Sequence, residues 1–490
     1  MTPPSIQPAS DASAPVLRTA TVSEIDISCR LPLMVLFTSA AKWLVIGWVF
    51  ELIASIKFHD PNFLADYSWL TYGRVHPAFS NSIIYGFCLQ AGFGVVLWLL
   101  AQTGGVALAH RWLVTVGAIF WNLGVTVGVI GILAGDSTGF EYLEMPGYAA
   151  VLMLIGYLLI GLLGVVTFHQ RRERQLTVSH WFFFTALFWF PWIYSTANLL
   201  LVTFPVRGMT QAVIAWWYSQ NLLVVWLALV GLGTVFYLVP RLAGRELTGR
   251  YTAIFIYWVL ILFAGWGGIP NSASVPAWLP TLSTVSTVLS LLAFIAVPLN
   301  VCETLGCSLA PARRNYPLSF FVFGVIAFCI SGFARAGCAL LDPNQIANFT
   351  WLNPAISQLS VYGFFAMVMF GAIYIILPRL LGVGLPWPKL VRVQLWLSGL
   401  GIILVVLPLA IGGVIQEVQL GDARRPFIEI MRSSLMSLRM STVGDLLLLV
   451  AHVLFLANVA GLVIGFYRAR AVVTYEELTE DLFKAARAKA

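Results

Sequence analysis

The chain contains 490 residues, of which 59% are hydrophobic and only 10% are charged, and its formal net charge is +7. Soluble globular domains have about 25% charged residues, so this composition excludes a soluble protein. Backbone amides left unpaired in hydrocarbon cost several kcal/mol, and apolar runs of about 20 residues therefore predict membrane-spanning helices. The positive charge lies mainly in short loops and a tail expected beside the membrane, so no nucleic-acid partner is predicted.

In chain order, the sequence begins with a polar segment. Residues 1–30 are rich in Pro, Ser, Ala and Thr and lack the apolar core of a signal peptide, so we expect a flexible cytoplasmic tail. Residues 31–470 contain twelve apolar runs, which predict an all-α polytopic membrane domain with twelve transmembrane helices. The expected spans are residues 31–56, 80–102, 110–134, 147–169, 179–203, 210–239, 251–269, 277–302, 317–341, 355–378, 391–415 and 442–468.

Lysine and arginine are concentrated in the two ends of the chain and in the even-numbered loops, for example at 169–175 and 241–250. The positive-inside rule therefore predicts that both termini are cytoplasmic and that the acidic segment 136–145 lies outside. Residues 471–490 have helical spacing and are expected to form a cytoplasmic tail on the inner membrane surface. The six cysteines show no C-x-x-C pairing and are interpreted as packing residues.

Charged side chains within the predicted spans are functional candidates, because each costs about 2.5–3.5 kcal/mol at the centre of a membrane helix. Lys42 and Glu51 lie on the first span at a spacing that directs them to opposite faces, so they cannot pair directly. Asp445 and His452 lie on the last span at a spacing that places them on one face. A proton path and structural pairing with neighbouring helices are both compatible with these four residues.

Several sequence blocks carry a family resemblance. The segment WWYSQN (216–221), followed by YLVPRLAGRELTGRYTAIFIYW (237–258), resembles subunit I of the heme-copper oxidases, specifically the cbb3-type group. Similar blocks follow the family's order at YGRVHPAFSNSIIYG (72–86), GWGGIPNSASVPAW (265–278) and YGFFAMVMFGAIYIILPRLLG (362–382). The resemblance implies twelve tilted helices in three quasi-symmetric arcs, located in a bacterial inner membrane and belonging to a multi-subunit respiratory complex.

The same resemblance implies six histidine ligands, which in this family hold two hemes and one copper ion. The matching positions in this sequence are Phe79 in span 2, Gln220 in span 6, and Ile356 and Gln358 in span 10. The turn between spans 7 and 8, where the family has two further copper ligands, contains no histidine. Since phenyl, alkyl and amide groups do not replace imidazole, we expect no heme, no copper and no catalytic residue in this chain, with heme in partner subunits.

The chain's own histidines offer few replacements. Only His452 is expected near the bilayer midplane, so a heme held there by two histidines is excluded. Two alternatives stay open: His76 could act as a ligand near the outer surface instead of capping a helix, and His452 could pair with Met367 or Met369.

The pocket of the family's oxygen-reducing site is expected between spans 6, 7 and 10. Because protein interiors tolerate few voids larger than a water molecule, we expect side chains to fill it. Tyr218 and Gln220 are expected to join one closed polar cluster there. The expected fillers are Trp216, Trp217, Tyr218, Trp266 and Phe364.

The favoured function is a metal-free subunit I homologue that serves as a membrane scaffold and docks a cytochrome c-type subunit. An acidic patch (Asp136, Glu141, Glu144) beside a basic one (Arg424, Arg425) is expected on the outer face, where it would suit electrostatic docking. The alternatives are an active terminal oxidase or nitric oxide reductase, and a proton or small-solute pathway. Twelve spans are also common in transporters, but the two halves of the chain show no internal similarity.

Overall fold

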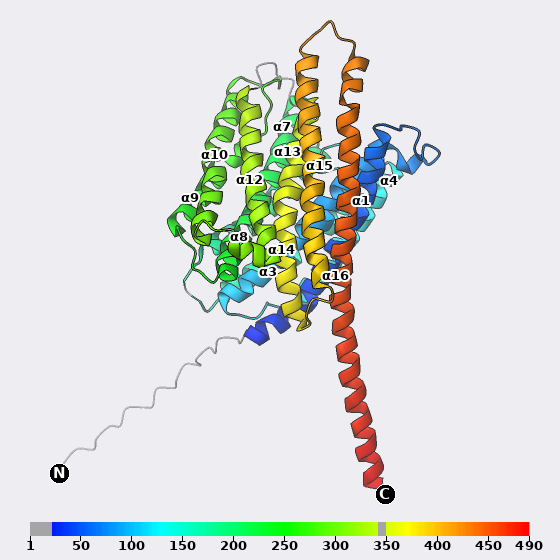
Figure 1. Ribbon diagram of the computed structural model, residues 1–490, viewed down its shortest axis with the longest axis vertical. Helices are drawn as coiled ribbons and strands as arrows, with labels where there is room; N and C mark the ends of the chain where they lie inside the picture. Colours follow the sequence, from blue (N-terminus) through cyan, green and yellow to red (C-terminus); the bar gives the residue numbers. More distant parts are fainter. Residues whose placement is uncertain (1–21, 174, 342–348, 490) are drawn as a thin grey trace, which may run out of the picture.

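The computed structural model describes residues 22–173, 175–341 and 349–489, and in these ranges the regular structure is helical. The helices form one bundle, with both ends of the described chain on the same side (Figure 1). Eleven helical spans are long and apolar enough to cross a membrane, and a twelfth helical segment, Arg250–Trp266, is shorter. The predicted all-α membrane fold is confirmed, and the predicted count of twelve spans is close.

The helical elements fall close to the predicted spans, and several spans are built from consecutive α- and π-helical pieces. In chain order they are α1 (Val22–Lys57), η1 (Ser68–Leu70), α2 (Tyr72–Asn81), η2 (Ser82–Cys88), α3 (Leu89–Gly104), α4 (Arg111–Ala134), α5 (Gly147–His169), α6 (Val178–Ala197), η3 (Asn198–Thr203), α7 (Met209–Gln220), η4 (Asn221–Trp226), α8 (Leu227–Ala243), α9 (Arg250–Leu262), η5 (Ala264–Trp266), α10 (Trp278–Leu305), α11 (Ala310–Arg314), α12 (Tyr316–Leu341), α13 (Leu352–Gln358), η7 (Leu359–Ala366), α14 (Met367–Leu381), α15 (Pro388–Leu420) and α16 (Phe427–Lys489).

Three spans form the interior of the bundle. The most apolar windows of α2–η2–α3, α7–η4–α8 and α13–η7–α14 are 100%, 100% and 94% buried, whereas those of the other long spans are at most 56% buried. Each inner span changes from α- to π-helix near its middle, at η2, η4 and η7. A fourth π-helical segment, η3, ends the fifth span outside this interior group. Since π-helical turns are rare and often occur at functional sites, the three inner segments are candidate positions for a site.

The inner spans are the second, sixth and tenth, so the architecture repeats every four spans and not every six. The sequence contains a matching signal, because LVPRLAG (238–244) and ILPRLLG (376–382) end the second and third inner spans in the same way. In both, a glycine with positive φ, Gly244 and Gly382, follows the last helical turn, which only glycine adopts readily. A threefold repeat of this kind produces no similarity between the two halves of the chain.

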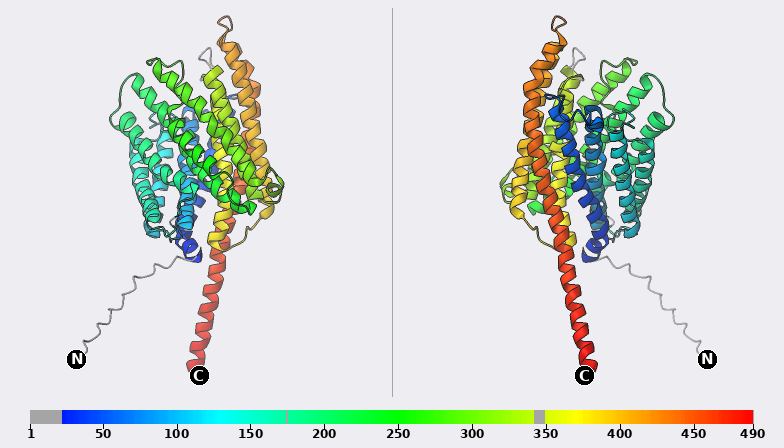
Figure 2. Two further views of the ribbon diagram at one scale, coloured as in Figure 1. Left: turned by 90° about the vertical axis from the view of Figure 1, so that its left-hand side faces the viewer. Right: turned by 90° about the vertical axis from the view of Figure 1, so that its right-hand side faces the viewer.

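Helices extend beyond the predicted membrane domain, residues 31–470, at both of its ends. Helix α1 begins at Val22, inside the segment predicted as a tail, and residues 1–21 of that tail lie outside the described residues. Asp26 in the first turns of α1 accepts hydrogen bonds from Trp98, Gln102 and Arg379, which fix it against the inner spans. At the other end, α16 runs unbroken from Phe427 to Lys489 and extends past the bundle instead of bending onto its surface (Figure 2).

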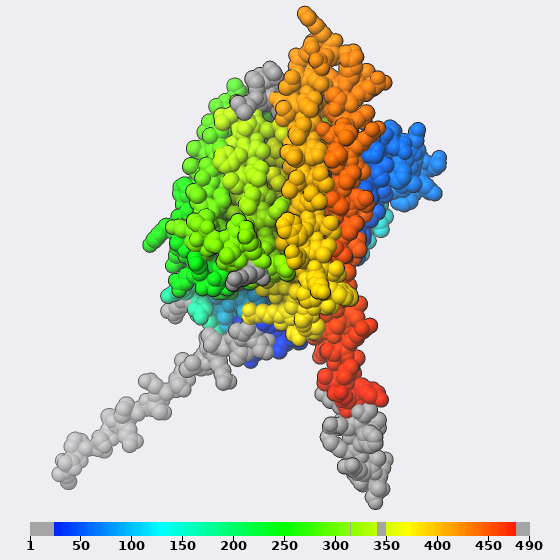
Figure 3. Space-filling model, in the orientation of Figure 1, coloured from blue at the N-terminus to red at the C-terminus, as the bar shows by residue number. Residues whose placement is uncertain are grey.

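Helices α15 and α16 form a hairpin that stands above the rest of the bundle at the end opposite the termini (Figure 3). Its connecting turn contains Arg424 and Arg425, both exposed. Arg425 forms an ion pair of 3.5 Å with Asp422 of the same turn. Val418, Phe427 and Ile428 near the tip are 73%, 65% and 58% exposed.

Candidate functional site: a membrane cavity on the inner spans

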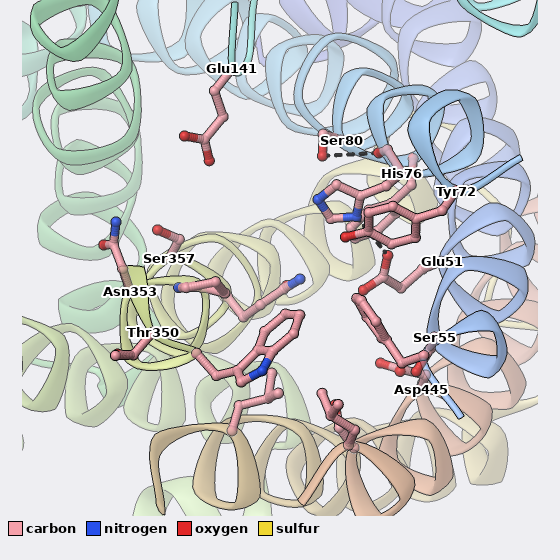
Figure 4. Close-up of a pocket in the computed structure, with 18 of the residues that line it drawn as sticks. Glu51, Ser55, Tyr72, His76, Ser80, Glu141, Thr350, Asn353, Ser357 and Asp445 are labelled. Atoms are coloured by element: carbon pink, nitrogen blue, oxygen red, sulfur yellow. Dashed lines mark hydrogen bonds and ion pairs between the residues drawn. The ribbon is translucent and has the colours of Figure 1, made fainter. Parts of the chain in front are cut away.

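A large cavity lies among α1, α2, α13–η7, α15 and α16 at the end opposite the termini, and has a volume of about 580 Å³. Figure 4 shows its polar side chains directed inward from several helices. Phe79 and Gln358, two of the four positions matched to heme and copper ligands, line this cavity. The other two, Gln220 and Ile356, line a second and smaller cavity.

His76 and Glu51 form the central polar contact of the large cavity. The His76 Nδ1 atom lies 3.6 Å from Glu51 Oε2, and the imidazole stacks on the ring of Tyr72 at 5.3 Å between centroids. His76 lies inside α2, whose N-cap is Thr71, so the prediction that it caps the helix is wrong. Pro77 follows within the same helix and removes one backbone donor from the hydrogen-bond ladder.

Asp445 enters the same cavity from α16, and Ser55 of α1 lines the cavity beside it. Ser55 Oγ lies 2.8 Å from Thr442 Oγ1, which lies 3.2 Å from His59 Nε2. The Asp445 side chain is only 1% exposed, and its Oδ1 atom has no hydrogen-bond partner among the described residues. A buried carboxylate oxygen without a donor is costly in a membrane interior.

Aromatic rings close the floor of the large cavity. Phe79 stacks parallel to Tyr362 at 6.5 Å, and both rings contact Trp48, at 5.7 and 4.8 Å. His452 lies beyond this layer, with Trp48, Tyr362 and Phe370 around its imidazole at 5.2, 6.3 and 5.8 Å. Asp445 and His452 thus share a face of α16 as expected from their spacing, but an aromatic layer surrounds the histidine.

Lys42 does not line the large cavity. Its side chain is exposed on the perimeter of the bundle, and Nζ is 5.2 Å from the centroid of the Trp43 ring. Glu51 faces the cavity on a different side of α1, in agreement with the opposite faces predicted from their spacing. Lys42 therefore does not belong to the cavity that contains Glu51 and Asp445.

The second cavity has a volume of only about 110 Å³ and contains the position matched to a copper ligand. The Gln220 amide donates to Ala264 O at 2.9 Å and packs against Gly267 and Gly268. Arg335 lines the same cavity and donates to Ser360 Oγ at 3.0 Å. Gln220 thus holds the loop after α9 in place.

The predicted fillers of this pocket are only partly right. Phe364 is buried between Phe328 and Gly231, and its ring occupies space that a larger residue at Gly231 would require. Trp266 is 56% exposed and fills nothing, because the 3-10 turn Ala264–Trp266 directs it outward.

Tyr218 and Gln220 do not join one cluster. Tyr218 Oη lies 2.5 Å from Tyr85 Oη, which donates to Tyr142 O at 2.6 Å. Gln220 bonds instead to the loop after α9. Side chains two residues apart on a helix face different directions, so the helix separates them.

The predicted acidic surface patch is only partly right, because one of its three residues, Glu144, is buried. Glu144 is 7% exposed and accepts a hydrogen bond of 2.7 Å from Asn81 Nδ2. Burial raises the pKa of Glu144 to about 7, against the smaller opposing effect of that hydrogen bond. Glu141 lines the large cavity, and burial raises the pKa of its carboxyl as well. Asp136 and Glu141 are both exposed, Asp136 away from the cavity and Glu141 at its edge, whereas Glu144 is buried.

Residues 32–447 match the family described as cytochrome c and quinol oxidase polypeptide I. The chain belongs to this family.

Curated relatives refine this assignment. The chain is 22% identical over 440 residues to a cytochrome c oxidase subunit 1 homolog of Azorhizobium caulinodans, covering 86% of this chain and 79% of the relative. It is 23% identical over 388 residues to a cbb3-type cytochrome c oxidase subunit of Stutzerimonas stutzeri (76% and 81%). It is 25% identical over 395 residues to cytochrome c oxidase subunit 1 of Rhodobacter capsulatus (76% and 73%). The prediction of a cbb3-type, subunit I-like protein of the heme-copper oxidase family is confirmed, as is a multi-pass membrane protein.

The residues present do not fit the cofactors of this oxidase family. In the part of the chain that is described, no group of three or more His, Cys, Asp or Glu side chains could hold a metal ion. Phe79 and Gln358 face the large cavity with a phenyl ring and an amide, and His76 already contacts Glu51. A heme held between two imidazoles, or a copper held by three, requires donors that these positions lack.

Sequence reasoning located the four matched positions but missed the cavity and Glu141. It treated Glu141 as a docking charge because a loop residue gives no periodic signal. The π-helical segments next to Phe79, Gln220 and Gln358 were missed as well, because the sequence pattern of a π-turn inside an apolar run is indistinguishable from that of an α-helix.

Proposed function

We propose that this heme-copper oxidase subunit I homologue binds neither heme nor copper and serves as a membrane scaffold of a larger respiratory redox complex. Its role is to position a heme-bearing partner, of the cytochrome c type, on the face opposite the termini. That face is extracytoplasmic if both termini are cytoplasmic, as the positive-inside rule predicts. The family membership and the relatives named as oxidase subunits support membership of a membrane complex.

The observation that carries this proposal is the use of Gln220. Its amide is hydrogen-bonded to Ala264 O and packed on two glycines, so the position matched to a copper ligand stabilises the fold. To bind a metal ion, the buried amide would have to break its hydrogen bond, and an amide is only a weak ligand for copper. The inner spans and their π-helical segments are present although the histidine ligands are absent. This combination favours a structural role for the fold.

Metal analysis tests the first half of the proposal. The purified chain, produced in cells supplied with a heme precursor and copper, is expected to show no α band in a reduced-minus-oxidised spectrum and no copper above the buffer blank. Because both supplements are present, a negative result cannot be caused by a shortage of heme or copper in the cells. Stoichiometric heme b or copper in the isolated chain would refute the proposal and favour the active-oxidase alternative.

Charge reversal at the hairpin tests the docking half. Arg424→Glu combined with Arg425→Glu is expected to weaken co-purification of the heme-bearing partner by up to about tenfold at moderate salt, since exposed ion pairs contribute about 0.2–1 kcal/mol each. The exposed apolar side chains of the hairpin tip would retain some binding.

The matched control reverses two exposed charges at the opposite end of α15, Lys389→Glu with Arg392→Glu, which should leave partner recovery unchanged. Insertion of all variants is checked by their yield in the membrane fraction. Recovery of every partner at wild-type levels with the hairpin variant would count against docking at this site.

A further inference from the structure

We propose that the large cavity is a binding site for a lipophilic organic cation, a quaternary ammonium or phosphonium ion with bulky apolar substituents. This inference concerns a ligand of the cavity and does not depend on the scaffold role. It rests on the acidic lining, two oxygen atoms without hydrogen-bond partners, the aromatic side chains and the volume of the cavity.

The charge of the lining is one-sided. Carboxylates enter from three separate segments, as Glu51 of α1, Glu141 of the loop before α5 and Asp445 of α16. Among the described lining residues His76 is the only basic side chain, and no lysine or arginine contributes. Burial raises the pKa of Glu141 and Glu51 contacts His76, so the lining does not carry three free negative charges, but without lysine or arginine it still favours a cation over an anion.

Two buried oxygens of the lining lack partners. Asp445 Oδ1 and the Tyr362 hydroxyl have no hydrogen-bond partner among the described residues, and these side chains are 1% and 3% exposed. Buried polar atoms in proteins are nearly always paired, so the free Oδ1 atom of Asp445, at the edge of the cavity, is available to an occupant. A cation near Asp445 would satisfy its charge without requiring a directed hydrogen bond.

The apolar lining selects among cations. Phe58 contacts Tyr72 and Trp351, at 5.0 and 4.8 Å between ring centroids, and all three rings border the cavity. Aromatic faces attract cations, most strongly when the cation is poorly hydrated, as quaternary ammonium ions are. A hydrated sodium or calcium ion would instead need several oxygen ligands within about 2.6 Å.

A compact metal ion does not fit. No three acidic, histidine or cysteine groups in the described ranges converge as a metal site, and Figure 4 shows Glu141 across the cavity from Glu51 and Asp445. The volume of about 580 Å³ lies within the range of about 300–1,000 Å³ that is typical of pockets for drug-sized molecules. A cation with a large apolar body can contact the carboxylates and the rings together.

The mouth of the cavity is accessible. Phe349 and Phe427 border it and are 74% and 65% exposed, so a ligand can enter from the end of the bundle that carries the α15–α16 hairpin. Exposed aromatic side chains at a cavity entrance also supply the first contacts for an apolar cation.

The test compares two ions of nearly equal size and shape but opposite charge, tetraphenylphosphonium and tetraphenylborate. Equilibrium dialysis is carried out with the full chain in detergent micelles, and binding to protein-free micelles is subtracted. We expect saturable binding of tetraphenylphosphonium and no saturable binding of tetraphenylborate. Similar binding of both ions would show simple partitioning into apolar surface and overturn the proposal.

Variants locate the site. Asp445→Asn and Glu51→Gln are each expected to weaken tetraphenylphosphonium binding by about tenfold or more, because each removes a charged contact. The control Glu303→Gln changes an exposed carboxylate on α10, away from the cavity, and should bind as the wild type does. Size-exclusion profiles identify any variant that misfolds, and two independent carboxylates keep the test decisive if one does.

Two results would overturn the site or its ligand class. Wild-type affinity in well-folded Asp445→Asn and Glu51→Gln variants would place the binding elsewhere. Displacement of tetraphenylphosphonium by sodium chloride, but not by choline chloride at equal ionic strength, would assign the cavity to a compact inorganic cation.

Discussion

Gly156→Ala is expected to lower the free energy of unfolding by about 3 kcal/mol, the upper part of the range for overpacked interiors. Gly156 of α5 faces α4, where the helices pack closely through several glycines. A Cβ atom at this position would lie 2.7 Å from Trp121 N and 2.8 Å from Gly117 O. Both are backbone atoms, which cannot rotate away, so the two helices must separate.

Thermal unfolding of the detergent-solubilised protein, followed by size-exclusion chromatography after heating, measures this effect. Gly73→Ala is the matched control, because a Cβ there meets no atom within 4 Å and the glycine has no positive φ. Equal melting temperatures for the two variants would contradict the close approach of α4 and α5.

Glu144→Gln is expected to remove a pH dependence of stability. The pKa of Glu144 is raised in the folded chain, from 4.5 to about 7, so folding takes up a proton between these pH values. Stability contributed by this group is therefore fully present below pH 4.5 and is lost as the pH rises to about 7. At about 1.36 kcal/mol per pKa unit, the loss is about 3 kcal/mol. Above about pH 7 the wild type should be less stable than Glu144→Gln by up to this amount.

Unfolding by heat at about pH 5 and about pH 8, on either side of the raised pKa, provides the measurement. The Glu144→Gln variant retains an oxygen that can accept the hydrogen bond from Asn81, so its stability at the lower pH should approach that of the wild type. Asp136→Asn, a change of the same kind at an exposed position of the same loop, should retain the wild-type difference between the two pH values. A Glu144→Gln variant that lost stability equally at both pH values would indicate a purely structural role for this carboxyl.

The sequence permitted accurate prediction of the features that follow from hydrophobicity along the chain. Lipid requires a helix wherever an apolar run is long enough, so the spans that contain Gln220 and Ile356 were placed within a few residues. The second span begins at Tyr72, earlier than its predicted start at residue 80. The helical period also assigned Lys42 and Glu51 to different faces correctly. The position of the short helix Arg250–Trp266 was predicted, although it falls below the length of the other spans.

Residues that interact through loops were predicted less well. Glu144 was interpreted as an exposed charge because it lies in an acidic, polar segment. In the fold this loop turns inward, and Glu144 meets Asn81 of the second span. The local amino-acid composition does not indicate such a contact, since burial of a loop depends on segments far away in the chain.

By itself the sequence therefore determined the membrane environment, the helical class, the family and the absence of imidazole at Phe79, Gln220, Ile356 and Gln358. These properties depend on residue type and on spacing along one helix. Only the tertiary structure decided that the four positions divide between a large and a small cavity, and that carboxylates from three distant segments meet in the large one. The physical reason is that a cavity is a property of packing: its volume and its charge arise where side chains from distant helices fail to fill the space between them.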